Sequence, residues 1–448
     1  MVAEPETLAV GPGQAPAAPR GSPPAHHPDL TPLPPPPPAT EPGAGADPAQ
    51  RSMAAHPEYL AVFSRAHHFL MRGDGPLAFD MRHYVAIMAV GRHQCHVLLD
   101  QLKEEFVASG GEQRWLDGLQ HVPKKLSDLS EVNKLLAHRP WLLNRSHIER
   151  LARGRDNWSL GELLQALTVL AHYHALCSFV LGCRALDADG AADSETEGPA
   201  RSSPGAAEPS ECASGPPSDG APVRQLMQKM RSLSEQRQSA GQLTPEQKNV
   251  IYEAVDSGGV VADRPAPRPP RHDIDRFVED ADFAYEDFSR RGEGSSVPTF
   301  RVQDYSWEDH GFSLVNRLYS DVGVLLDDKF RTAYQLTYQT MGSFRAVDTG
   351  LFRRAVWRYI QCLYGIRHDD YDYAVVNQLL DRRLKAFVKT MCVYPERLDG
   401  AGGGLRPLSD GMQGFQHSEK VHVAILCLEA RLQSELLYAL RAVMRYTT

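Results

Sequence analysis

Residues 84–90 form an uninterrupted apolar run, and this run most constrains what the chain can fold into. A helix at a protein surface keeps one polar face, so a helix that is apolar all round has to be buried. The helical spacing of apolar residues continues to about residue 106, which predicts one continuous core helix over residues 81–106. Cys95 would then lie inside that helix, one turn after Arg92.

Helical periodicity also dominates the rest of the chain. Apolar residues recur at helical spacing through residues 56–186 and again through residues 305–448. Strand patterns are few, because strict alternation is rare and no Asn-Gly hairpin turn occurs. The sequence therefore predicts an all-α protein with two helical lobes.

Composition divides the chain into four parts. Residues 1–52 are rich in Pro, Ala and Gly, and we expect them to be disordered because they cannot bury enough apolar surface. Residues 53–186 form the predicted N-terminal helical lobe, and residues 299–448 form the C-terminal lobe. Between the lobes, residues 187–298 form an acidic, Pro-rich linker that is partly disordered.

Smaller features are expected within these parts. Two short linker helices are predicted, one over residues 223–237 and one after Thr244, where Pro245 takes the first helical position. In the C-terminal lobe, the glycine-rich residues 399–404 predict a flexible loop.

Charge and cysteine usage exclude several classes of protein. The net charge is −8, from 48 basic and 56 acidic residues, and no block of Lys and Arg indicates binding to nucleic acid. The seven cysteines are scattered without a Cys-x-x-Cys motif, as is typical of the reduced cytosol or nucleus. The most apolar long stretch, residues 163–183, contains Gln165 and two histidines, which favours a buried helix over a membrane span.

Two polar patterns have structural explanations of their own. Ser159 stands three residues before Glu162, which is the spacing of a capping box at a helix start. The acidic residues 369–372 precede another helical stretch, where they would cap the helix or interact with its dipole. They lack the glycine and the glutamate of a calcium-binding loop, and we expect neither a metal nor a cofactor.

Five long motifs resemble the sestrin family, in the family's order, over about residues 56–186 and 277–448. The resemblance implies two lobes that each have the helical fold of the alkylhydroperoxidase AhpD, which is the carboxymuconolactone decarboxylase-like fold. It also implies a stress-responsive protein of the cytoplasm, or of the nucleus, with a part in redox homeostasis. The motifs are Arg92-His-Gln-Cys95, Asn133-Lys-Leu-Leu-Ala-His-Arg-Pro-Trp141, Trp307-Glu-Asp-His-Gly311, Arg367-His-Asp-Asp-Tyr-Asp-Tyr373 and His417-Ser-Glu-Lys-Val-His422.

The resemblance links the N-terminal lobe to peroxide reduction, for which Cys95 would be the catalytic thiolate. Such chemistry needs a proton for the departing alkoxide, and the family resemblance implies a Tyr and a His two and seven positions after the cysteine. Val97 and Leu102 stand there and can donate no proton. Whether the protein is an enzyme stays open, and a small buried side chain is the favoured interpretation of Cys95.

The resemblance also implies that the C-terminal lobe binds free leucine. A desolvated zwitterion needs an acid for its ammonium group and a base for its carboxylate. By resemblance these are Glu419 and Arg353, although Glu419 could equally be a first-turn acid that interacts with the helix dipole. The other implied contacts are hydroxyl and ring side chains, namely Thr337, Tyr338, Thr340, Thr349, Phe352, Phe415 and His422.

Partner binding is implied for Asp369, Asp370 and Ser159, which the resemblance assigns to a contact with the GATOR complex. The function predicted first is therefore a leucine sensor that binds GATOR and restrains signalling by the TOR kinase complex. A thiol-dependent hydroperoxide reductase using Cys95 is the alternative, and a helical scaffold that binds no ligand is the third.

The chain also departs from the family pattern beside the predicted leucine site. Phe352 and Met412 replace residues of different size, and residues 397–416 are longer and richer in glycine than the corresponding family segment. These changes leave the affinity for leucine and the preference over methionine or isoleucine open.

Overall fold

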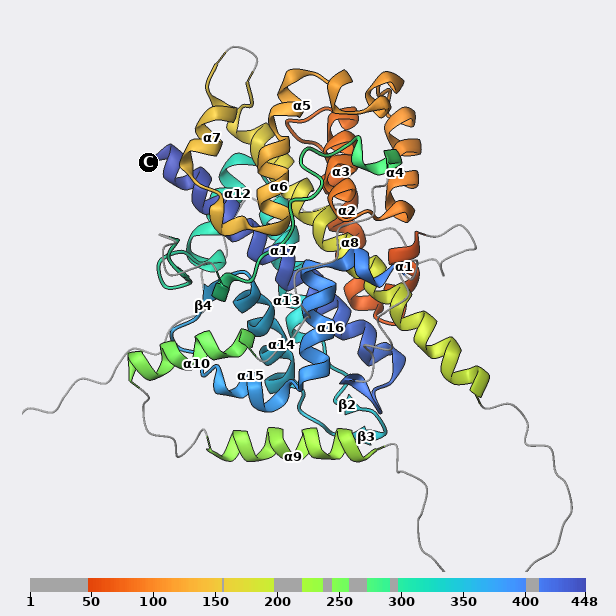
Figure 1. The fold of residues 1–448 in the computed structure, drawn as a ribbon, viewed down its shortest axis with the longest axis vertical. Coiled ribbons are helices and arrows are strands. Elements are labelled where there is room, and N and C mark those ends of the chain that lie inside the picture. Colours follow the sequence, from red (N-terminus) through yellow and green to blue (C-terminus); the bar gives the residue numbers. More distant parts are fainter. Residues whose placement is uncertain are drawn as a thin grey trace, which may run out of the picture. The chain divides into compact units, whose positions relative to one another are not determined.

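Helices dominate the computed structural model, which describes residues 47–154, 157–196, 220–236, 244–257, 272–290, 297–399 and 411–448 (Figure 1). The strands in these residues form two small pairs, β1 parallel to β4 and β2 antiparallel to β3. The predicted all-α class is therefore confirmed. Of residues 1–52, for which disorder is predicted, residues 1–46 lie outside the described residues and residues 48–52 belong to a helix. Residues 400–404 of the predicted loop also lie outside the described residues.

The helices and strands follow one another in a simple order. The α-helices are α1 (Pro48–Met53), α2 (Pro57–Arg72), α3 (Phe79–Arg92), α4 (His96–Ala108), α5 (Lys124–Asp128), α6 (Ser130–His138), α7 (Arg145–Ala152), α8 (Leu160–Thr196), α9 (Ala221–Gln236), α10 (Pro245–Ser257), α11 (His272–Asp275), α12 (Phe312–Leu318), α13 (Val322–Gln335), α14 (Gly350–Leu363), α15 (Ala374–Leu379), α16 (Arg382–Val393) and α17 (His417–Thr447). The strands are β1 (Phe300–Arg301), β2 (Thr340–Met341), β3 (Phe344–Arg345) and β4 (Ile366–Arg367).

The two longest helices, α8 and α17, pack against each other and form the centre of the core (Figure 1). By length and composition, Leu160–Ala188 of α8 is apolar enough to cross a membrane. Its apolar window is entirely buried within the protein, as predicted for residues 163–183. α17 is buried along most of its length as well. Each helix therefore buries its apolar side chains largely against other helices of the same chain.

The predicted continuous helix over residues 81–106 is wrong, because the chain forms two helices there, α3 and α4. Gln94 lies between them with φ of 49°, a left-handed conformation through which a right-handed helix cannot continue. Cys95 is consequently the N-cap residue of α4 and not an internal helix residue. The apolar pattern itself was interpreted correctly, since residues 84–90 are all fully buried.

Helix α2 connects the two predicted lobes. It belongs to the predicted N-terminal lobe, but it packs against α13 of the C-terminal lobe. Tyr59 of α2 donates a hydrogen bond to the carboxylate of Glu429 on α17, and Lys329 of α13 forms an ion pair of 3.1 Å with the same carboxylate. All three side chains are fully buried, so the two lobes share a common interior.

Parts of the predicted linker are helices that pack on the rest of the chain. The helices predicted over residues 223–237 and after Thr244 are confirmed as α9 and α10. At the start of α10, the backbone N–H of Gln247 donates to the Thr244 hydroxyl at 3.3 Å, and the Thr244 N–H donates back to the Gln247 side chain at 3.0 Å. Helix α1 begins before residue 53 and α8 ends after residue 186, while the lobe boundaries stay predictions.

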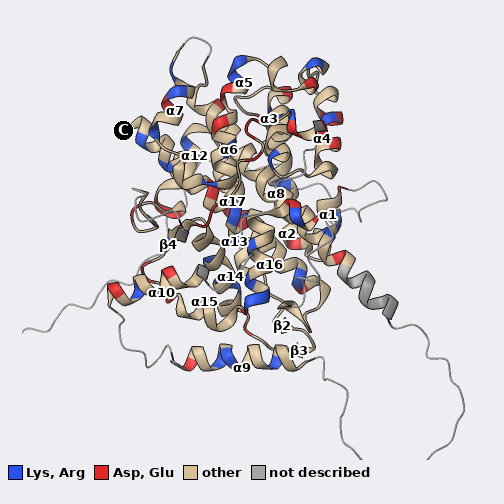
Figure 2. Ribbon diagram, viewed as in Figure 1, with Lys and Arg blue, Asp and Glu red and all other residues tan. Residues whose placement is uncertain are grey.

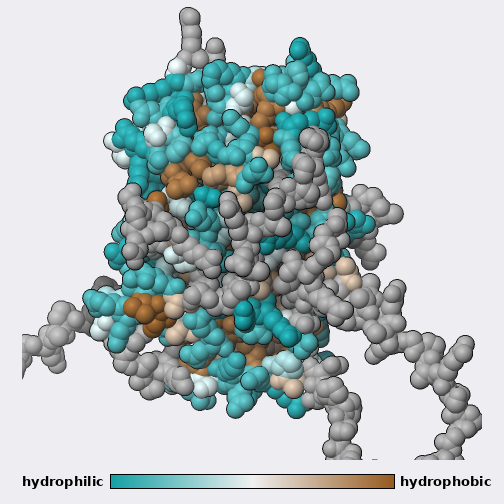
Figure 3. All heavy atoms as spheres, in the orientation of Figure 1, coloured by the Kyte–Doolittle hydropathy of each residue, from teal (hydrophilic) through white to brown (hydrophobic). Residues whose placement is uncertain are grey.

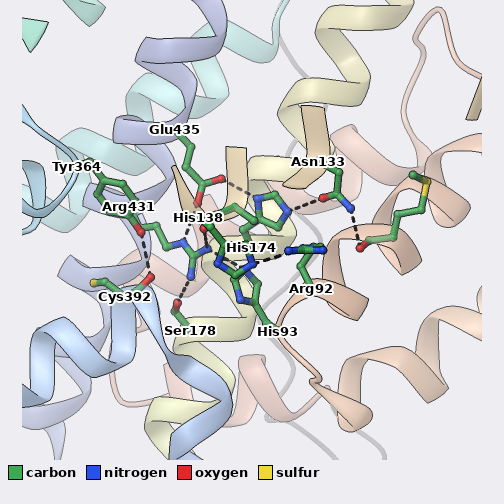
Figure 4. A network of polar contacts seen from close by, with 12 residues as sticks. Arg92, His93, Asn133, His138, His174, Ser178, Tyr364, Cys392, Arg431 and Glu435 are labelled. Atoms are coloured by element: carbon green, nitrogen blue, oxygen red, sulfur yellow. Dashed lines mark hydrogen bonds and ion pairs between the residues drawn. The ribbon is translucent and has the colours of Figure 1, made fainter. Parts of the chain in front are cut away.

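A buried network of polar side chains ties α17 to α3 and α8 (Figure 4). The guanidinium of Arg431 donates to Glu435 at 2.8 Å and to Ser178 of α8 at 2.7 Å. It also lies 2.8 Å from Nε2 of His93, the residue that ends α3. Burial, together with the charge of Arg431, lowers the pKa of His93 well below its ordinary value, so the neutral ring can accept this hydrogen bond.

The same network continues into α6 (Figure 4). The second carboxylate oxygen of Glu435 lies 2.8 Å from Nδ1 of His174, and Nε2 of that ring lies 2.8 Å from Oδ1 of Asn133. Asn133 then donates to the backbone carbonyl of Met88 in α3 at 2.9 Å. Because these groups have no access to water, each depends on the next for its hydrogen bond.

The coloured part of the face shown in Figure 3 is mainly hydrophilic. Lys, Arg, Asp and Glu lie along the outer faces of helices such as α4 and α9 (Figure 2). On the face that Figure 3 shows, hydrophobic areas are small, and one of them lies over α10. This helix carries Val250, whose side chain is 66% exposed. Linker helix α10 therefore presents apolar surface to the solvent.

We expect Arg431→Met to lower the free energy of unfolding by about 3–5 kcal/mol, because it leaves the Glu435 carboxylate buried without its cation. Urea unfolding of the purified protein measures this loss. Arg431→Met combined with Glu435→Gln should be more stable than the single variant. Arg445→Met, on an exposed position of the same helix, should change the value by less than about 0.5 kcal/mol. Equal losses for Arg431→Met and Arg445→Met would contradict the role given to the network.

Candidate functional site

A cavity of about 40 Å³ lies between α14 and α17, beneath the segment that connects α13 to α14. All the residues that the resemblance assigned to a leucine site line this one cavity, and the structure thus brings them together from three parts of the chain. They are Thr337, Tyr338, Thr340, Thr349, Arg353 and Glu419, with Phe352, Phe415 and His422. The other lining residues are His56, Met341, Val423 and Leu426.

A short hairpin, residues 340–345, lines one side of the cavity through Thr340 and Met341, and we refer to it as the lid hairpin. It consists of β2, a turn at Gly342 and β3. Gly342 has φ of 61°, and a Cβ atom at this position would lie only 2.4 Å from the carbonyl oxygen of Gly414. Only glycine fits there without displacing the backbone. On either side, Gln339 and Ala346 also have positive φ, so the hairpin is bounded by two sharp changes of direction.

Glu419 forms the acidic wall of the cavity. It lies in the first turn of α17, where its carboxylate accepts the backbone N–H of Gln416 at 2.9 Å in a capping box. The same carboxylate accepts the N–H of Gly342 at distances of 2.8 and 3.0 Å. The interpretation of Glu419 as a first-turn acid is therefore correct, and the side chain also holds the lid hairpin. Among the described residues, Glu419 has no ion-pair partner.

Arg353 forms the basic wall. Its Nε donates to the hydroxyl of Thr349 at 3.1 Å, and its Nη1 donates to the carbonyl oxygen of Tyr334. The Thr349 hydroxyl lies 3.4 Å from that of Thr337. Burial lowers the pKa of the Arg353 guanidinium from its ordinary value. The hydrogen bonds of this side chain thus go to neutral acceptors, and no carboxylate of the described residues forms an ion pair with it.

His56 is a lining residue that the sequence did not reveal. Its Nδ1 lies 2.9 Å from the hydroxyl of Tyr338, and its Nε2 lies 2.8 Å from the carbonyl oxygen of Ser418. These partners are 282 and 362 residues away along the chain, so no local pattern could have indicated the contact. Nearby, Nε2 of His422 lies 3.3 Å from the carbonyl oxygen of Ala333, and burial lowers the pKa of this ring to about 4.

The remaining lining is apolar. The rings of Phe352 and Phe415 meet edge to face, with centroids 5.7 Å apart. Val423 and Leu426 add aliphatic surface from α17. Met412, which departs from the family pattern, is fully buried but does not line the cavity. The apolar side of the cavity therefore depends on Phe352 more than on Met412.

The two aspartates predicted to contact a partner differ in their surroundings. They lie in residues 368–372, which we call the acid-pair turn. Asp369 forms ion pairs with Arg367 at 3.0 Å and with Arg301, whose Nε lies 3.0 Å from the carboxylate. Asp370 is exposed. The capping predicted for this acidic stretch is confirmed for Asp372, whose Oδ1 accepts the N–H of Ala374, the first residue of α15, at 3.0 Å. The first turn of α15 itself contains no acidic residue.

Ser159 has the structural role expected from its spacing. Its N–H donates to the Glu162 carboxylate at 2.8 Å, and its hydroxyl accepts the Glu162 N–H at 3.3 Å, so the predicted capping box is confirmed. Glu162 also forms an ion pair of 2.7 Å with Lys125. The serine is exposed, and no hydrogen bond or ion pair recorded for the described residues joins it to the acid-pair turn. Its role in partner binding stays a prediction.

Cys95 is fully buried beside a second thiol, that of Cys177 on α8. A hydrogen bond from Cys177 lowers the pKa of Cys95 and outweighs the opposite effect of burial. Burial also raises the pKa of Cys177 well above its ordinary value. At the two positions of the missing relay, Leu102 is buried and Val97 is partly buried. This environment favours the interpretation of Cys95 as a packed core residue.

Fold and cavity together define a helical protein with a small cavity whose walls carry opposite charges. Residues 42–447 match the protein family described as PA26 p53-induced protein (sestrin). The chain is 48% identical over 408 residues to Sestrin-2 of Homo sapiens, covering 88% of this chain and 83% of that protein. It is 45% identical over 414 residues to Sestrin-1 of Xenopus laevis, covering 88% and 84%. It is also 41% identical over 459 residues to the Sestrin homolog of Drosophila melanogaster, covering 88% and 91%.

The chain therefore belongs to the sestrin family, as its motifs predicted.

Two partly buried histidines make stability depend on pH. Burial lowers the pKa of both His67 and His422 to about 4, below the ordinary value of 6.5. Below pH 6.5 the unfolded chain binds protons at these rings that the folded protein does not bind. The free energy of unfolding should thus fall between pH 6.5 and 4, by about 2 kcal/mol per ring at pH 5.

Urea unfolding at pH 7.5 and pH 5 measures this loss. His422→Gln should lose about 2 kcal/mol less than the parent between the two values. His68→Gln, at an exposed position of α2, should lose as much as the parent. The explanation is wrong if His422→Gln and the parent lose the same amount.

Proposed function

We propose that this sestrin is a leucine sensor of the cytoplasm or nucleus that binds the GATOR complex and restrains TOR signalling. Two lines of argument support the proposal. The sestrin resemblance implies this role, and the residues it assigns to leucine line a single cavity. The thiol peroxidase alternative has less support, because Cys95 is fully buried and the two relay positions carry Val97 and Leu102.

The observation that carries the proposal is the pair of opposite charges across the cavity. Glu419 and Arg353 both line it, and neither forms an ion pair within the described residues. An α-amino acid carries an ammonium and a carboxylate on adjacent atoms, so it can satisfy both walls at once. Thr349, which already accepts from Arg353, can donate its hydroxyl proton to the ligand carboxylate. The apolar lining then receives an aliphatic side chain.

The size of the cavity indicates that binding requires a movement. Its volume of about 40 Å³ is well below the roughly 150 Å³ of a cavity that holds benzene. Room can come from the lid hairpin, which Glu419 holds through the N–H of Gly342. A ligand ammonium would compete with that N–H for the same carboxylate. Ligand binding is therefore coupled to the position of the lid hairpin.

The acid-pair turn provides a basis for partner binding at a second place. Asp370 is exposed and available for a basic partner, whereas Asp369 is held by Arg301 and Arg367. In this proposal Asp370 contacts GATOR directly and Asp369 fixes the shape of the turn. Exposed charges of this kind steer association and fix its register.

Glu419→Ala and Arg353→Ala should abolish the stabilisation that millimolar leucine gives to the parent. Each variant removes one charge-assisted bond to the ligand, worth about 1.5–3 kcal/mol, or roughly tenfold to a hundredfold in affinity. Thermal unfolding with each of the twenty amino acids measures the effect, because a ligand stabilises the folded state by RT ln(1 + [L]/Kd).

Arg354→Ala is the matched control for Arg353→Ala, since it removes the same charge at the next residue, where the side chain donates to the Tyr334 hydroxyl. It should keep the leucine response. Both cavity variants should still bind GATOR, but leucine should no longer release them. If the parent responds to no amino acid, the sensor proposal is wrong and the scaffold interpretation replaces it.

The acid-pair turn gives a separate prediction. Asp370→Ala should weaken capture of the GATOR complex from cell lysate without changing thermal stability, because its side chain is exposed. Asp369→Ala should weaken capture as well and also lower the melting temperature, since it leaves Arg301 and Arg367 without their carboxylate. The leucine response should persist in both variants. Undiminished capture by Asp370→Ala would exclude this turn as the direct contact.

A further inference from the structure

Linker helix α9 packs against the outer side of the lid hairpin. Val223 near its start is 1% exposed, and its Cγ2 would lie 3.4 Å from a Cβ atom at Gly342. The guanidinium of Arg224 lies over the ring of Phe344 in β3, 5.7 Å from the ring centroid. In Figure 1, α9 runs beside β3 and α15. The lid hairpin therefore lies between the cavity and α9.

Gly342 contacts residues of the cavity wall and of helix α9 at the same time. On the cavity side, its N–H donates to Glu419, and its carbonyl oxygen accepts from Nε2 of Gln416 at 2.8 Å. On the outer side it lies against Val223. A glycine has no side chain to absorb a displacement, so any shift of the hairpin tip changes the contact with α9 directly.

Helix α9 is attached to the rest of the protein through one narrow stripe of buried side chains. Its buried residues Val223, Met230 and Leu233 recur at helical spacing, while Arg224 and Lys229 are exposed. An isolated helix of this length is marginally stable in water, so its helicity depends on the contacts of this one stripe. The position of α9 is therefore sensitive to the surface on which it packs.

The linker also reaches the acid-pair turn. Helix α9 contacts α15, which begins directly after this turn. Helix α10 contacts α15 too, and its Lys248 donates to the carbonyl oxygen of Asp369 at 3.1 Å. Tyr252 of α10 packs edge to face on Tyr373, with ring centroids 4.9 Å apart. One linker therefore contacts both the lid hairpin and the turn that carries the two aspartates.

We propose that α9 is a positioning element of the amino-acid site, in which Val223 and Arg224 hold the lid hairpin, and that α9 and α10 connect the hairpin to the acid-pair turn. The inference rests on the proposed function and states which helices connect the amino-acid site to the acid-pair turn. When the lid hairpin moves to admit leucine, α9 moves with it, and α15 and α10 change the surroundings of Asp369 and Asp370.

The first test uses Val223→Asp, which places a carboxylate at the buried contact with the hairpin. The leucine concentration for half-maximal thermal stabilisation should rise by about fivefold or more, the range of ordinary coupling between sites. Gln225→Asp, which adds the same charge at an exposed position of α9, should respond like the parent, and Val223→Ile should preserve the response. Arg224→Ala leaves the buried stripe intact and should shift the concentration in the same direction.

The second test is hydrogen exchange of the full chain. Amides of residues 340–345 should exchange faster in Val223→Asp than in Gln225→Asp without ligand. In the parent, leucine should change the protection of α9 and α10 but not that of α4, which packs on α3. If Val223→Asp and the parent show the same leucine response and the same hydrogen exchange in the lid hairpin, the inference is overturned. The sensor proposal is then left intact. A parent that responds to no amino acid overturns both.

Discussion

The charge of Arg431 has to be compensated by protein groups alone, because its side chain has no access to water. Glu435 supplies the opposite charge, while His93 and Ser178 provide hydrogen bonds from the end of α3 and from α8. An incomplete network of this kind would be costly in the low-dielectric interior. It therefore fixes how α3, α8 and α17 pack. Glu419 lies about three turns earlier on the same helix, α17. The network that holds α17 therefore also positions the wall of the cavity that carries Glu419.

The opposite wall is built differently. The lid hairpin has few internal hydrogen bonds and is held by Glu419, Gln416 and the contact with α9. A carboxylate can accept about four hydrogen bonds, and in this structure backbone N–H groups use part of that capacity on Glu419. The cavity thus combines one wall on a helix held by a buried hydrogen-bond network with one wall held by a few hydrogen bonds near its edge.

Sequence patterns predicted best those features that depend on residues close to one another in the chain. The capping box at Ser159, the helix start after Thr244 and the burial of residues 163–183 follow from neighbours in the chain. The break at Gln94 was not predicted, because the left-handed residue is neither a glycine nor an asparagine and the apolar periodicity continues past it. Glu419 was assigned to the cavity by family resemblance, whereas its bond to the lid hairpin depends on a turn distant in the sequence.

The contact between His56 and Ser418 joins residues that are 362 positions apart. During translation, His56 therefore emerges from the ribosome long before Ser418 does. Until α17 emerges, the nascent chain carries Arg353 and the threonines without the acid that faces them, and α2 lacks Glu429 as its buried partner. The complete cavity consequently cannot exist during most of translation. A chain whose synthesis stops before α17 would therefore lack the acidic wall of the cavity.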